Sequence, residues 1–377
     1  MTNAAQPDIR IPADLLPRDG RFGSGPSKVR PEQVSAIEKA GVMGTSHRQA
    51  PVKSLVGRLR KGVAELFALP DGYEVVIGNG GTTTFWDVAT FGLIQDRSQH
   101  LSFGEFSSKF AVAARTAPHL EEPEVIESAT GTHPWAEPRA GIDLYALTHN
   151  ETSTGVMMPL TRPDGTAGQA LVAVDATSGA GALRFDPSEV DAYYFAPQKC
   201  FASDGGLWVA VLSPAALERA RSIHDQKRWV PASLDLSIAI EQSRLDQTYN
   251  TPALATIIMF VDQLEWMLEG GGLDFSAGRS EASARTLYGW AESSDYATPF
   301  VAKPDERSNV VGTIDLADSV DATTVSKVLR AHGVVDTDSY RKLGRNQLRI
   351  AMFPAIDPAD VQALTHCIDH VANALAG

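Results

Sequence analysis

Short apolar runs recur between helical patterns along this chain of 377 residues, and they leave few architectures open to it. Each run has five to seven residues and is rich in β-branched and aromatic side chains. Such runs are typical of strands that are buried on both faces of a sheet, as in parallel sheets covered by helices. The predicted strands span residues 74–78, 142–148, 171–175, 191–196 and 207–212. The sequence therefore predicts an α/β fold.

Helical patterns at 83–94, 107–116, 214–220 and 252–268 would cover the faces of this sheet, the last of them opened by Thr251-Pro252. Gly270-Gly271-Gly272 ends that helix and marks the passage to a second unit, because consecutive glycines terminate helices. Beyond it, strands at 309–316, 334–335 and 347–352 and helices at 323–332 and 358–376 predict a small α+β domain. We expect an N-terminal segment (1–20) packed with the small domain, a large domain (21–272) and a small C-terminal domain (273–377).

Charge and cysteine content limit the classes of function. The chain carries 33 basic and 46 acidic residues, and a net charge of −13 repels nucleic acids and anionic membrane surfaces. Two cysteines, Cys200 and Cys367, are too few for a disulfide framework or a multi-cysteine metal site. The first ten residues contain no apolar stretch typical of an export signal. We therefore expect a cytoplasmic protein with no metal site that binds neither nucleic acid nor membrane.

An aspartate and a lysine follow two successive predicted strands. Asp175 ends the strand at 171–175, and Lys199 comes just after the strand at 191–196. The carboxyl ends of parallel strands face the ligand crevice, so both side chains could reach one bound molecule. A lysine there can form a Schiff base with an aldehyde, and an aspartate can keep a pyridine nitrogen protonated. Taken alone, such a pair is more commonly a structural salt bridge.

A loop rich in glycine and threonine, Gly78-Asn79-Gly80-Gly81-Thr82-Thr83-Thr84, lies between the first predicted strand and a helix. Glycines permit close backbone approach, and a helix N-terminus offers N–H donors to a phosphate. The loop lacks the lysine of a Walker motif and the spacing of a dinucleotide fingerprint. It is either a phosphate-binding loop or a glycine-rich turn with a threonine cap.

Eight ordered motifs from Arg21 to the C-terminal strand resemble the phosphoserine aminotransferases, most closely their actinobacterial branch. The motifs are Arg21-Phe22-Gly23-Ser24-Gly25-Pro26, Thr45-Ser46-His47-Arg48, Gly80-Gly81-Thr82, His149-Asn150-Glu151-Thr152, Asp175, Gln198-Lys199, Tyr249-Asn250-Thr251-Pro252 and Leu348-Arg349-Ile350. The resemblance implies a fold-type-I enzyme that uses pyridoxal 5′-phosphate, with a mainly parallel seven-stranded sheet and a small α+β domain. It also implies a homodimer with active sites at the subunit interface.

By this resemblance, Lys199 forms the Schiff base, Asp175 pairs with the pyridine nitrogen and Thr152 binds the ring hydroxyl. Phe106 lies where the family stacks an aromatic side chain on the cofactor ring, although a core aromatic is a close alternative. The groups implied to hold the cofactor phosphate are Gly81, Thr82 and Gln198 from one subunit and Asn250 and Thr251 from its partner.

The substrates implied are L-glutamate and 3-phosphohydroxypyruvate, which need cation sites in an acidic protein. By resemblance Arg349 binds the amino-acid carboxylate, and His47 and Arg48 help to bind the phosphate or the distal carboxylate. The basic stretch before Arg349 differs in spacing from much of the family, so Arg341 and Arg345 are both candidates for the phosphate. Lys342 is interpreted as a solvated charge.

We therefore expect an aminotransferase that makes O-phospho-L-serine and 2-oxoglutarate in serine biosynthesis. The same family member in many bacteria also aminates 3-hydroxy-2-oxo-4-phosphonooxybutanoate on the way to pyridoxine. One alternative is a serine–glyoxylate or alanine–glyoxylate aminotransferase of the same fold. The other is a non-catalytic scaffold, against which the intact Lys199 and Asp175 argue.

Overall fold

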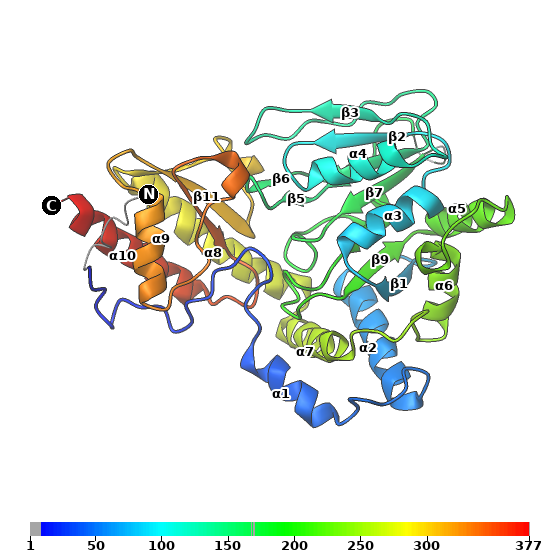
Figure 1. The fold of residues 1–377 in the computed structure, drawn as a ribbon, viewed down its shortest axis with the longest axis horizontal. Helices are drawn as coiled ribbons and strands as arrows, with labels where there is room; N and C mark the ends of the chain where they lie inside the picture. Colours follow the sequence, from blue (N-terminus) through cyan, green and yellow to red (C-terminus); the bar gives the residue numbers. More distant parts are fainter. Residues whose placement is uncertain (1–8, 167, 169, 377) are drawn as a thin grey trace.

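The computed structural model describes residues 9–166, 168 and 170–376, and a seven-stranded sheet forms its centre (Figure 1). In spatial order the strands are β1 (Glu74–Asn79), β9 (Leu207–Leu212), β8 (Ala192–Phe195), β7 (Leu171–Asp175), β4 (Leu144–Thr148), β2 (Ser98–Ser102) and β3 (Glu124–Glu127). β9 pairs antiparallel with both of its neighbours, and the other pairs are parallel. The predicted α/β fold with a mainly parallel seven-stranded sheet is confirmed.

Helices cover both faces of this sheet because side chains alternate along each strand. Val75 and Ile77 of β1 belong to the hydrophobic core under α2 and α7, whereas Val76 belongs to the core under α3 to α6. The helices of this part are α1 (Pro31–Ala40), α2 (Ala50–Leu66), α3 (Thr82–Gly92), α4 (Ser107–Thr116), α5 (Pro214–Asp225), α6 (Leu236–Arg244) and α7 (Leu254–Gly270). The short turns η1 (Pro187–Glu189) and η2 (Ala232–Leu234) and the hairpin of β5 (Asn150–Glu151) and β6 (Val156–Met157) complete it.

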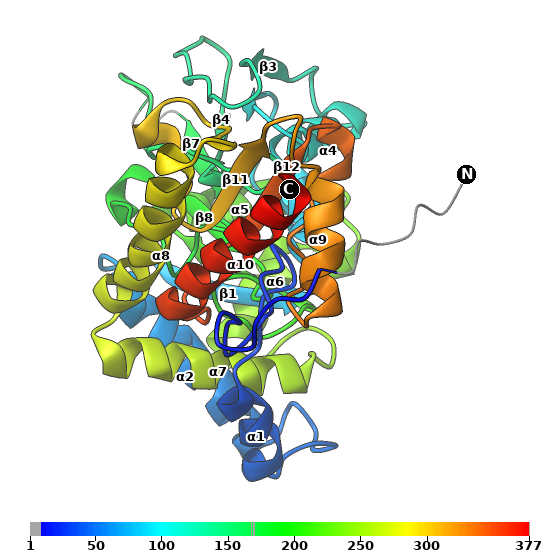
Figure 2. The same ribbon diagram turned by 90° about the vertical axis from the view of Figure 1, so that its left-hand side faces the viewer.

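A third hydrophobic core lies in the C-terminal part of the chain, which Figure 2 shows face on. Its antiparallel sheet has the order β10 (Ala297–Pro299), β11 (Val311–Leu316) and β12 (Gln347–Ala351). Its helices are α8 (Leu273–Ser293), α9 (Ala322–Ala331) and α10 (Pro358–Ala376), with the short turns η3 (Pro304–Glu306) and η4 (Arg341–Leu343). Since α8 begins directly after Gly272, the three glycines lie at the start of this part, where the sequence predicted a boundary.

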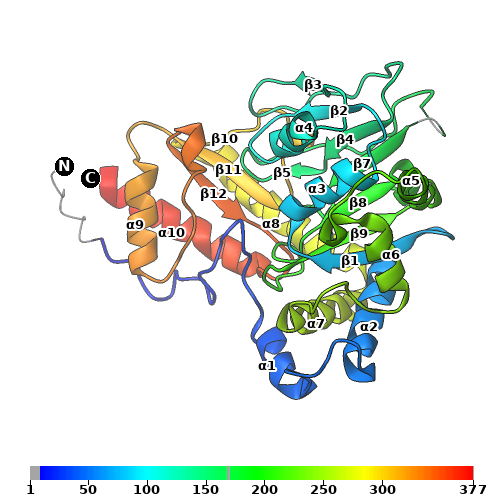
Figure 3. The same cartoon turned by 45° about the vertical axis from the view of Figure 1, so that its right-hand side comes forward.

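The N-terminal segment runs along the C-terminal part before it passes to α1 (Figure 3). Ile11 is buried in the third core, and its backbone N–H donates to His332 Nε2 at 3.2 Å. Phe22 is fully buried in the same core, and its carbonyl oxygen accepts from the backbone N–H of Ala351. The segment that contacts this core thus extends at least to Phe22, and residues 1–8 of the predicted segment lie outside the described residues.

Among the elements that the sequence did not predict are α1, α2, α6, α8, β2 and β3. The other differences from the predicted elements are local. Residues 334–335 do not form a strand; Val335 makes an isolated bridge with Arg21. α7 begins at Leu254 rather than at Pro252, so Thr251 does not cap it. Among the described residues, no helix combines the length and the apolar content that crossing a bilayer requires.

Candidate active site

Asp175 and Lys199 line one cavity at the carboxyl edge of the large sheet. β7 and β8 are parallel neighbours, so the residues that follow them meet at that edge. The cavity has a volume of about 200 Å³. Its lining consists of Gly81, Thr82, Thr83, Trp86, Phe106, Lys109, Thr148, Asn150, Thr152, Asp175, Thr177, Ser178, Gln198 and Lys199. The structure therefore brings together every cofactor residue predicted from the sequence except Asn250 and Thr251.

The carboxylate of Asp175 is buried and held by three donors. Its Oδ1 accepts from the backbone N–H and the hydroxyl of Thr177 at 3.0 and 2.6 Å, and its Oδ2 accepts from Trp86 Nε1 at 3.1 Å. Burial raises the pKa of Asp175 to about 6, while the bonds from Thr177 and Trp86 lower it. A nearby cation would favour the ionised form further, as a protonated pyridine nitrogen would.

The amine of Lys199 is buried at the cavity wall. Its Nζ donates to the carbonyl oxygen of Ser24 at 2.5 Å. Burial, with the positive charge of Arg349, lowers the pKa of Lys199 to about 8. Gly25 has a φ of +150°, and a Cβ on it would lie 1.8 Å from Lys199 Nζ. This close approach requires glycine at position 25.

The N-terminus of α3 borders the cavity at Gly81 and Thr82. No described side chain caps this helix, so its first N–H groups are available to an anion. The turn before it needs Gly80, which has a φ of +108° and whose Cβ would lie 2.3 Å from Thr84 Oγ1. Nearby, Gln198 Oε1 is buried with no hydrogen-bond partner in the described part of the chain. These groups form a polar cradle beside Lys199.

The ring of Phe106 lines the cavity and is half-buried. Its position is fixed by Glu151, a buried carboxylate that accepts from the backbone N–H groups of Phe106 and Ser107 at the start of α4. Glu151 also accepts from the hydroxyl of Ser153. Thr152, next to Glu151, is buried at the cavity wall.

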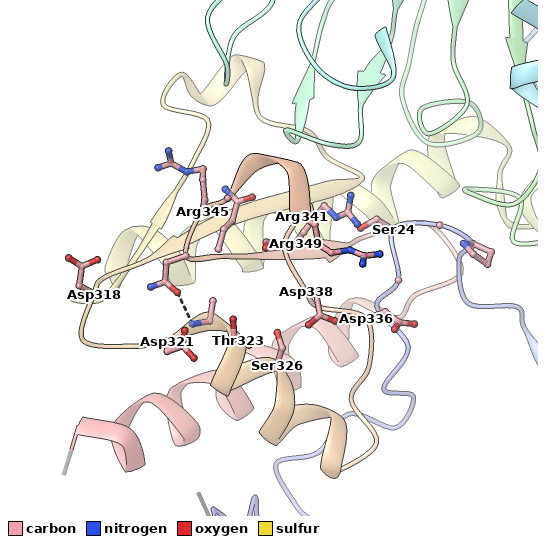
Figure 4. A pocket seen from close by; sticks show the side chains of 18 residues that line it. Ser24, Asp318, Asp321, Thr323, Ser326, Asp336, Asp338, Arg341, Arg345 and Arg349 are labelled. Atoms are coloured by element: carbon pink, nitrogen blue, oxygen red, sulfur yellow. Dashed lines mark hydrogen bonds between the residues drawn. The ribbon is translucent and has the colours of Figure 1, made fainter. Parts of the chain in front are cut away.

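A larger cavity of about 930 Å³ lies on the other side of Ser24 and Gly25 and is lined by Arg341, Arg345 and Arg349. Figure 4 shows Arg341 and Arg349 directed toward Ser24, and Arg345 directed away from it. Arg349 lies on β12, its Nη1 is 3.5 Å from the carbonyl oxygen of Thr152, and its Nε is buried without a partner among the described residues. The Arg349 guanidinium thus faces the boundary between the two cavities.

The basic residues before Arg349, which are Arg341, Lys342 and Arg345, differ in the groups that they contact. Arg345 Nε donates to both oxygens of Asp315 at 3.1 and 3.2 Å, and its guanidinium stacks 4.7 Å from the Phe300 ring centroid. Lys342 Nζ donates to Glu105 at 2.6 Å, so it is paired rather than merely solvated. Arg341 is exposed and forms no ion pair with any residue that the structure describes. Arg341 is therefore the cation of this group that is available to a ligand.

His47, Arg48, Asn250 and Thr251 line neither cavity and lie together elsewhere. Thr251 Oγ1 is 3.3 Å from His47 Nδ1, and Arg48 Nη1 donates to Gln247 Oε1 at 2.6 Å. Burial and the charge of Arg48 lower the pKa of His47. Within one chain these residues do not reach the cavity of Lys199.

Cys200, His149 and His224 each contact a neighbouring protein group. Cys200 Sγ lies 3.3 Å from the carbonyl oxygen of Ser178, and burial raises the pKa of its thiol well above the ordinary value. His149 Nδ1 lies 3.0 Å from the hydroxyl of Tyr193, and burial lowers the pKa of His149 to about 3. His224 is exposed and lies 3.6 Å from Asp235. In the described ranges, no group of three His, Cys, Asp or Glu side chains could hold a metal ion.

Comparison with known proteins agrees with this geometry. Residues 27–337 match the family model of the class-V aminotransferases. A phosphoserine aminotransferase from a Nocardioides species is 61% identical over 378 residues, which cover 100% of both chains. The chain belongs to the phosphoserine aminotransferase family within class V. The resemblance predicted from the eight motifs is confirmed.

Solved structures extend the match to the fold of class V. The crystal structure of a phosphoserine aminotransferase from Cytophaga hutchinsonii superposes with a TM-score of 0.84 at 25% identity, covering 93% of this chain and 99% of that one. An aspartate aminotransferase from Thermus thermophilus superposes with a TM-score of 0.79 at 22% identity, covering 94% and 99%. Because aminotransferases that are named for different substrates share this fold, the fold alone does not identify the substrate.

Sequence reasoning missed several residues of this class-V site. Ser24 and Glu151 stand inside the recognised motifs, but neither was given a role. Thr177, two residues after Asp175, carried a local signal, because threonine often bonds a nearby carboxylate or backbone group. Trp86 carried none.

Proposed function

We propose that the protein uses pyridoxal 5′-phosphate to transfer the amino group of L-glutamate to 3-phosphohydroxypyruvate, which gives O-phospho-L-serine and 2-oxoglutarate. The observation that carries the proposal is the buried pair of Lys199 and Asp175 on one cavity, in a chain 61% identical to a phosphoserine aminotransferase. By this proposal the protein serves serine biosynthesis, and nothing in the sequence excludes the phosphorylated hydroxy-oxobutanoate of pyridoxine biosynthesis as a second acceptor.

The groups on the cavity fit this cofactor. The uncapped N-terminus of α3 at Gly81 and Thr82 would hold its phosphate, together with Gln198, whose buried Oε1 is otherwise unpaired. Asp175 would hold the ring nitrogen, Phe106 would cover the ring and Thr152 would bind the ring hydroxyl. When bound, the protonated pyridine ring supplies an electron sink for the α-carbon of the substrate.

Lys199 would bind the cofactor aldehyde and move the proton. With a pKa of about 8, roughly a tenth of Nζ is neutral at pH 7, far more than for an ordinary lysine, and only a neutral amine can attack a carbonyl or accept a proton. The Ser24 carbonyl holds the same atom in place until a ligand displaces it. Lys199 Nζ can thus take a proton and return it within one small cavity.

The two anionic ends of the substrate would bind different arginines. Arg349, which faces the boundary of the two cavities, suits the α-carboxylate common to all the substrates because its planar guanidinium can bind two oxygens. Arg341 suits the phosphate because Asp315 already neutralises Arg345 and Glu105 pairs with Lys342. The structure thus favours Arg341 over Arg345.

A homodimer would complete the site. The segments that carry His47, Arg48, Asn250 and Thr251 also expose large apolar side chains. These are Val34, Met43, Leu245 and Tyr249, with exposed fractions of 57%, 54%, 55% and 44%. Exposed apolar side chains on neighbouring segments favour an interface. A second copy of the chain would bury them and bring Asn250 and Thr251 to the partner's cofactor, and His47 and Arg48 to its substrate.

We also propose the division of the chain into an N-terminal segment, a large domain that ends at Gly272 and a small domain that begins at Leu273. The hydrophobic core built mainly from α8, α9, α10 and the three-stranded sheet supports it, although Ala182, Leu183 and Cys200 of the large domain also belong to this core. In this arrangement the small domain supplies Arg341 and Arg349, and the large domain supplies Lys199 and Asp175. The substrate would lie between them.

The test is an assay of the purified protein with L-glutamate and 3-phosphohydroxypyruvate. Hydroxypyruvate and glyoxylate are the comparison acceptors, and a Lys199→Ala variant is the control. We expect formation of 2-oxoglutarate with the phosphorylated acceptor and a kcat/KM at least tenfold lower with the others. Equal or better use of glyoxylate would favour the glyoxylate-type alternative, and inactivity with all acceptors would favour the non-catalytic scaffold.

A further inference from the structure

The hydrogen bonds of Asp175 leave a single acceptor position open. An ionised carboxylate offers about four such positions, two on each oxygen. Thr177 fills both positions on Oδ1 with its backbone N–H and its hydroxyl, at 3.0 and 2.6 Å. Trp86 fills one position on Oδ2 with its indole N–H at 3.1 Å. The open position is therefore on Oδ2, next to the Trp86 bond.

We propose that Trp86 is a positioning residue, whose indole N–H holds Asp175 so that Oδ2 receives the protonated ring nitrogen of the cofactor. The identity of that ring rests on the proposed function, but the hydrogen bond from Trp86 Nε1 to Asp175 Oδ2 does not depend on it. Trp86 is 5% exposed and lines the same cavity as Asp175. A rigid indole buried under the sheet also keeps the carboxylate from rotating.

A second residue of α3 acts on the other oxygen of Asp175. The Thr177 hydroxyl has one proton, which goes to Oδ1, so the contact of 2.6 Å between Thr82 Oγ1 and Thr177 Oγ1 has Thr82 as its donor. Thr82 and Trp86 are four residues apart and share one face of the helix. α3 therefore directs its N-terminus to the phosphate site and one face to the aspartate, and it sets their spacing.

Among the described residues, Trp86 donates the hydrogen bond that fixes Oδ2 of Asp175. The hydroxyl of Tyr194 lies near both groups, since the Asp175 carboxylate raises the pKa of Tyr194 and the Trp86 indole lowers it. The indole N–H nevertheless donates to Asp175 Oδ2, and the Tyr194 hydroxyl has no hydrogen-bond partner in the described part of the chain. The other titratable groups around Asp175 are Tyr193, Lys199 and Cys200 on and after β8, Glu151 on β5 and His149 beside β7. Burial keeps the pKa of His149 near 3 and the tyrosine and cysteine pKa values high, so these groups do not change charge between pH 5 and pH 7.

The test is thermal unfolding of the cofactor-free protein at pH 5 and pH 7, for the wild type and Trp86→Phe. The pKa of Asp175 is about 6, so the carboxyl is mainly neutral at the first pH and mainly ionised at the second. A hydrogen bond to an ionised group is stronger than one to a neutral group. We expect Trp86→Phe to lower Tm more at pH 7 than at pH 5, and to weaken the binding of pyridoxal 5′-phosphate about tenfold.

Trp208→Phe is the matched control. Trp208 is 2% exposed and packs in the same hydrophobic core as Trp86, 5.1 Å from the ring centroid of Phe85, without a contact to Asp175. Its Tm loss should be the same at both pH values. Equal losses at the two pH values for Trp86→Phe, with unchanged cofactor affinity, would mean that Trp86 only fills space and would overturn the proposal.

An NMR measurement on the wild type avoids any dependence on the folding of Trp86→Phe. The chain has six tryptophans, and one indole N–H signal of the cofactor-free protein should titrate near pH 6. In Asp175→Asn this titration should be absent. If the same indole signals titrate in both proteins, Trp86 does not bond Asp175. Failure of the transamination assay, by contrast, would refute the proposed function and leave this result intact.

Discussion

Lys199 Nζ lies 2.5 Å from the carbonyl oxygen of Ser24, so this lysine is held by a segment 175 residues earlier in the chain. That segment separates the cavity of about 200 Å³, which contains Asp175, from the cavity of about 930 Å³ lined by the arginines. Its backbone must pass very close to the amine, and only glycine at position 25 allows this.

Gly25→Ala should therefore disable the enzyme. The new Cβ would lie 1.8 Å from Lys199 Nζ and 2.7 Å from its Cε, which forces the amine out of place. Displacement of a catalytic group by about 1 Å costs on the order of a hundredfold in rate, so we expect at least this loss in kcat. Gly41→Ala is the control, because Gly41 also has a positive φ but has nothing within 4 Å of its Cβ. Comparable kcat losses in the two variants would contradict the assigned contact.

Asp175→Asn should make the stability of the cofactor-free protein less dependent on pH while it abolishes most of the activity. The folded-state pKa of Asp175 is raised from 3.8 to about 6, so the protonated form is favoured by folding. Its contribution to stability is present below pH 4 and is lost as the pH rises through 6, by at most about 3 kcal/mol. Asparagine has no charge to desolvate. Chemical unfolding at pH 5 and pH 7 should show a smaller pH dependence in the variant, and an unchanged dependence would show that Asp175 does not titrate there.

Both cysteines should be unreactive in the folded protein. Burial raises the pKa of the Cys200 thiol strongly and that of Cys367 to about 11, so the thiolate, which is the nucleophile, is scarce. A thiol reagent at pH 8 should label neither residue until denaturant is added, and the denatured protein should give two labels per chain. Rapid labelling of Cys200 in the native protein would mean that it is accessible beside Lys199.

The sequence predicted those parts of the site whose residues follow strands. Asp175 and Lys199 come after apolar runs that are recognisable in the sequence, and parallel neighbours must bring such residues to one edge. β2 was not predicted because its residues are largely polar. Ser98 and His100, both buried, bond each other at 2.8 Å, and no hydrophobic pattern reveals such a strand.

Contacts between distant segments could not be predicted in this way. Trp86 bonds Asp175 across 89 residues and Lys342 bonds Glu105 across 237, and neither pair has a local pattern. Thr251 lies 3.3 Å from His47, and its carbonyl oxygen accepts from Asn79 at the end of β1, yet neither His47 nor Thr251 lines the cavity of Lys199. The family resemblance identified these residues in the sequence, but it did not predict where they lie in the folded chain.

The proposed dimer predicts that two inactive variants complement each other. Lys199→Ala lacks the reactive amine, and Asn250→Ala/Thr251→Ala lacks the groups that would reach the partner's cofactor. In a mixed dimer one site has both defects and the other has none, since each site takes Lys199 from one chain and Asn250 and Thr251 from the other. Mixed dimers, confirmed by mass, should recover up to half of the wild-type activity per dimer. Activity no higher than that of the separate variants would show that each chain carries a complete site.

The basic stretch before β12 gives the most specific prediction about the substrate. Arg341 is the exposed cation of the large cavity that forms no ion pair within the described residues, whereas Arg345 is paired with Asp315 and Lys342 with Glu105. Loss of a charge-assisted contact to the phosphate should lower kcat/KM for 3-phosphohydroxypyruvate about ten- to a hundredfold in Arg341→Ala, with little change in KM for glutamate.

Arg349→Ala should instead raise KM for both substrates, because both have the α-carboxylate. Lys342→Ala is the matched control and should change either constant less than about threefold, since exposed ion pairs contribute little. A selective loss in Arg345→Ala rather than Arg341→Ala would show that the substrate displaces Asp315, and equal small effects at all four positions would leave His47 and Arg48 of the partner as the phosphate site.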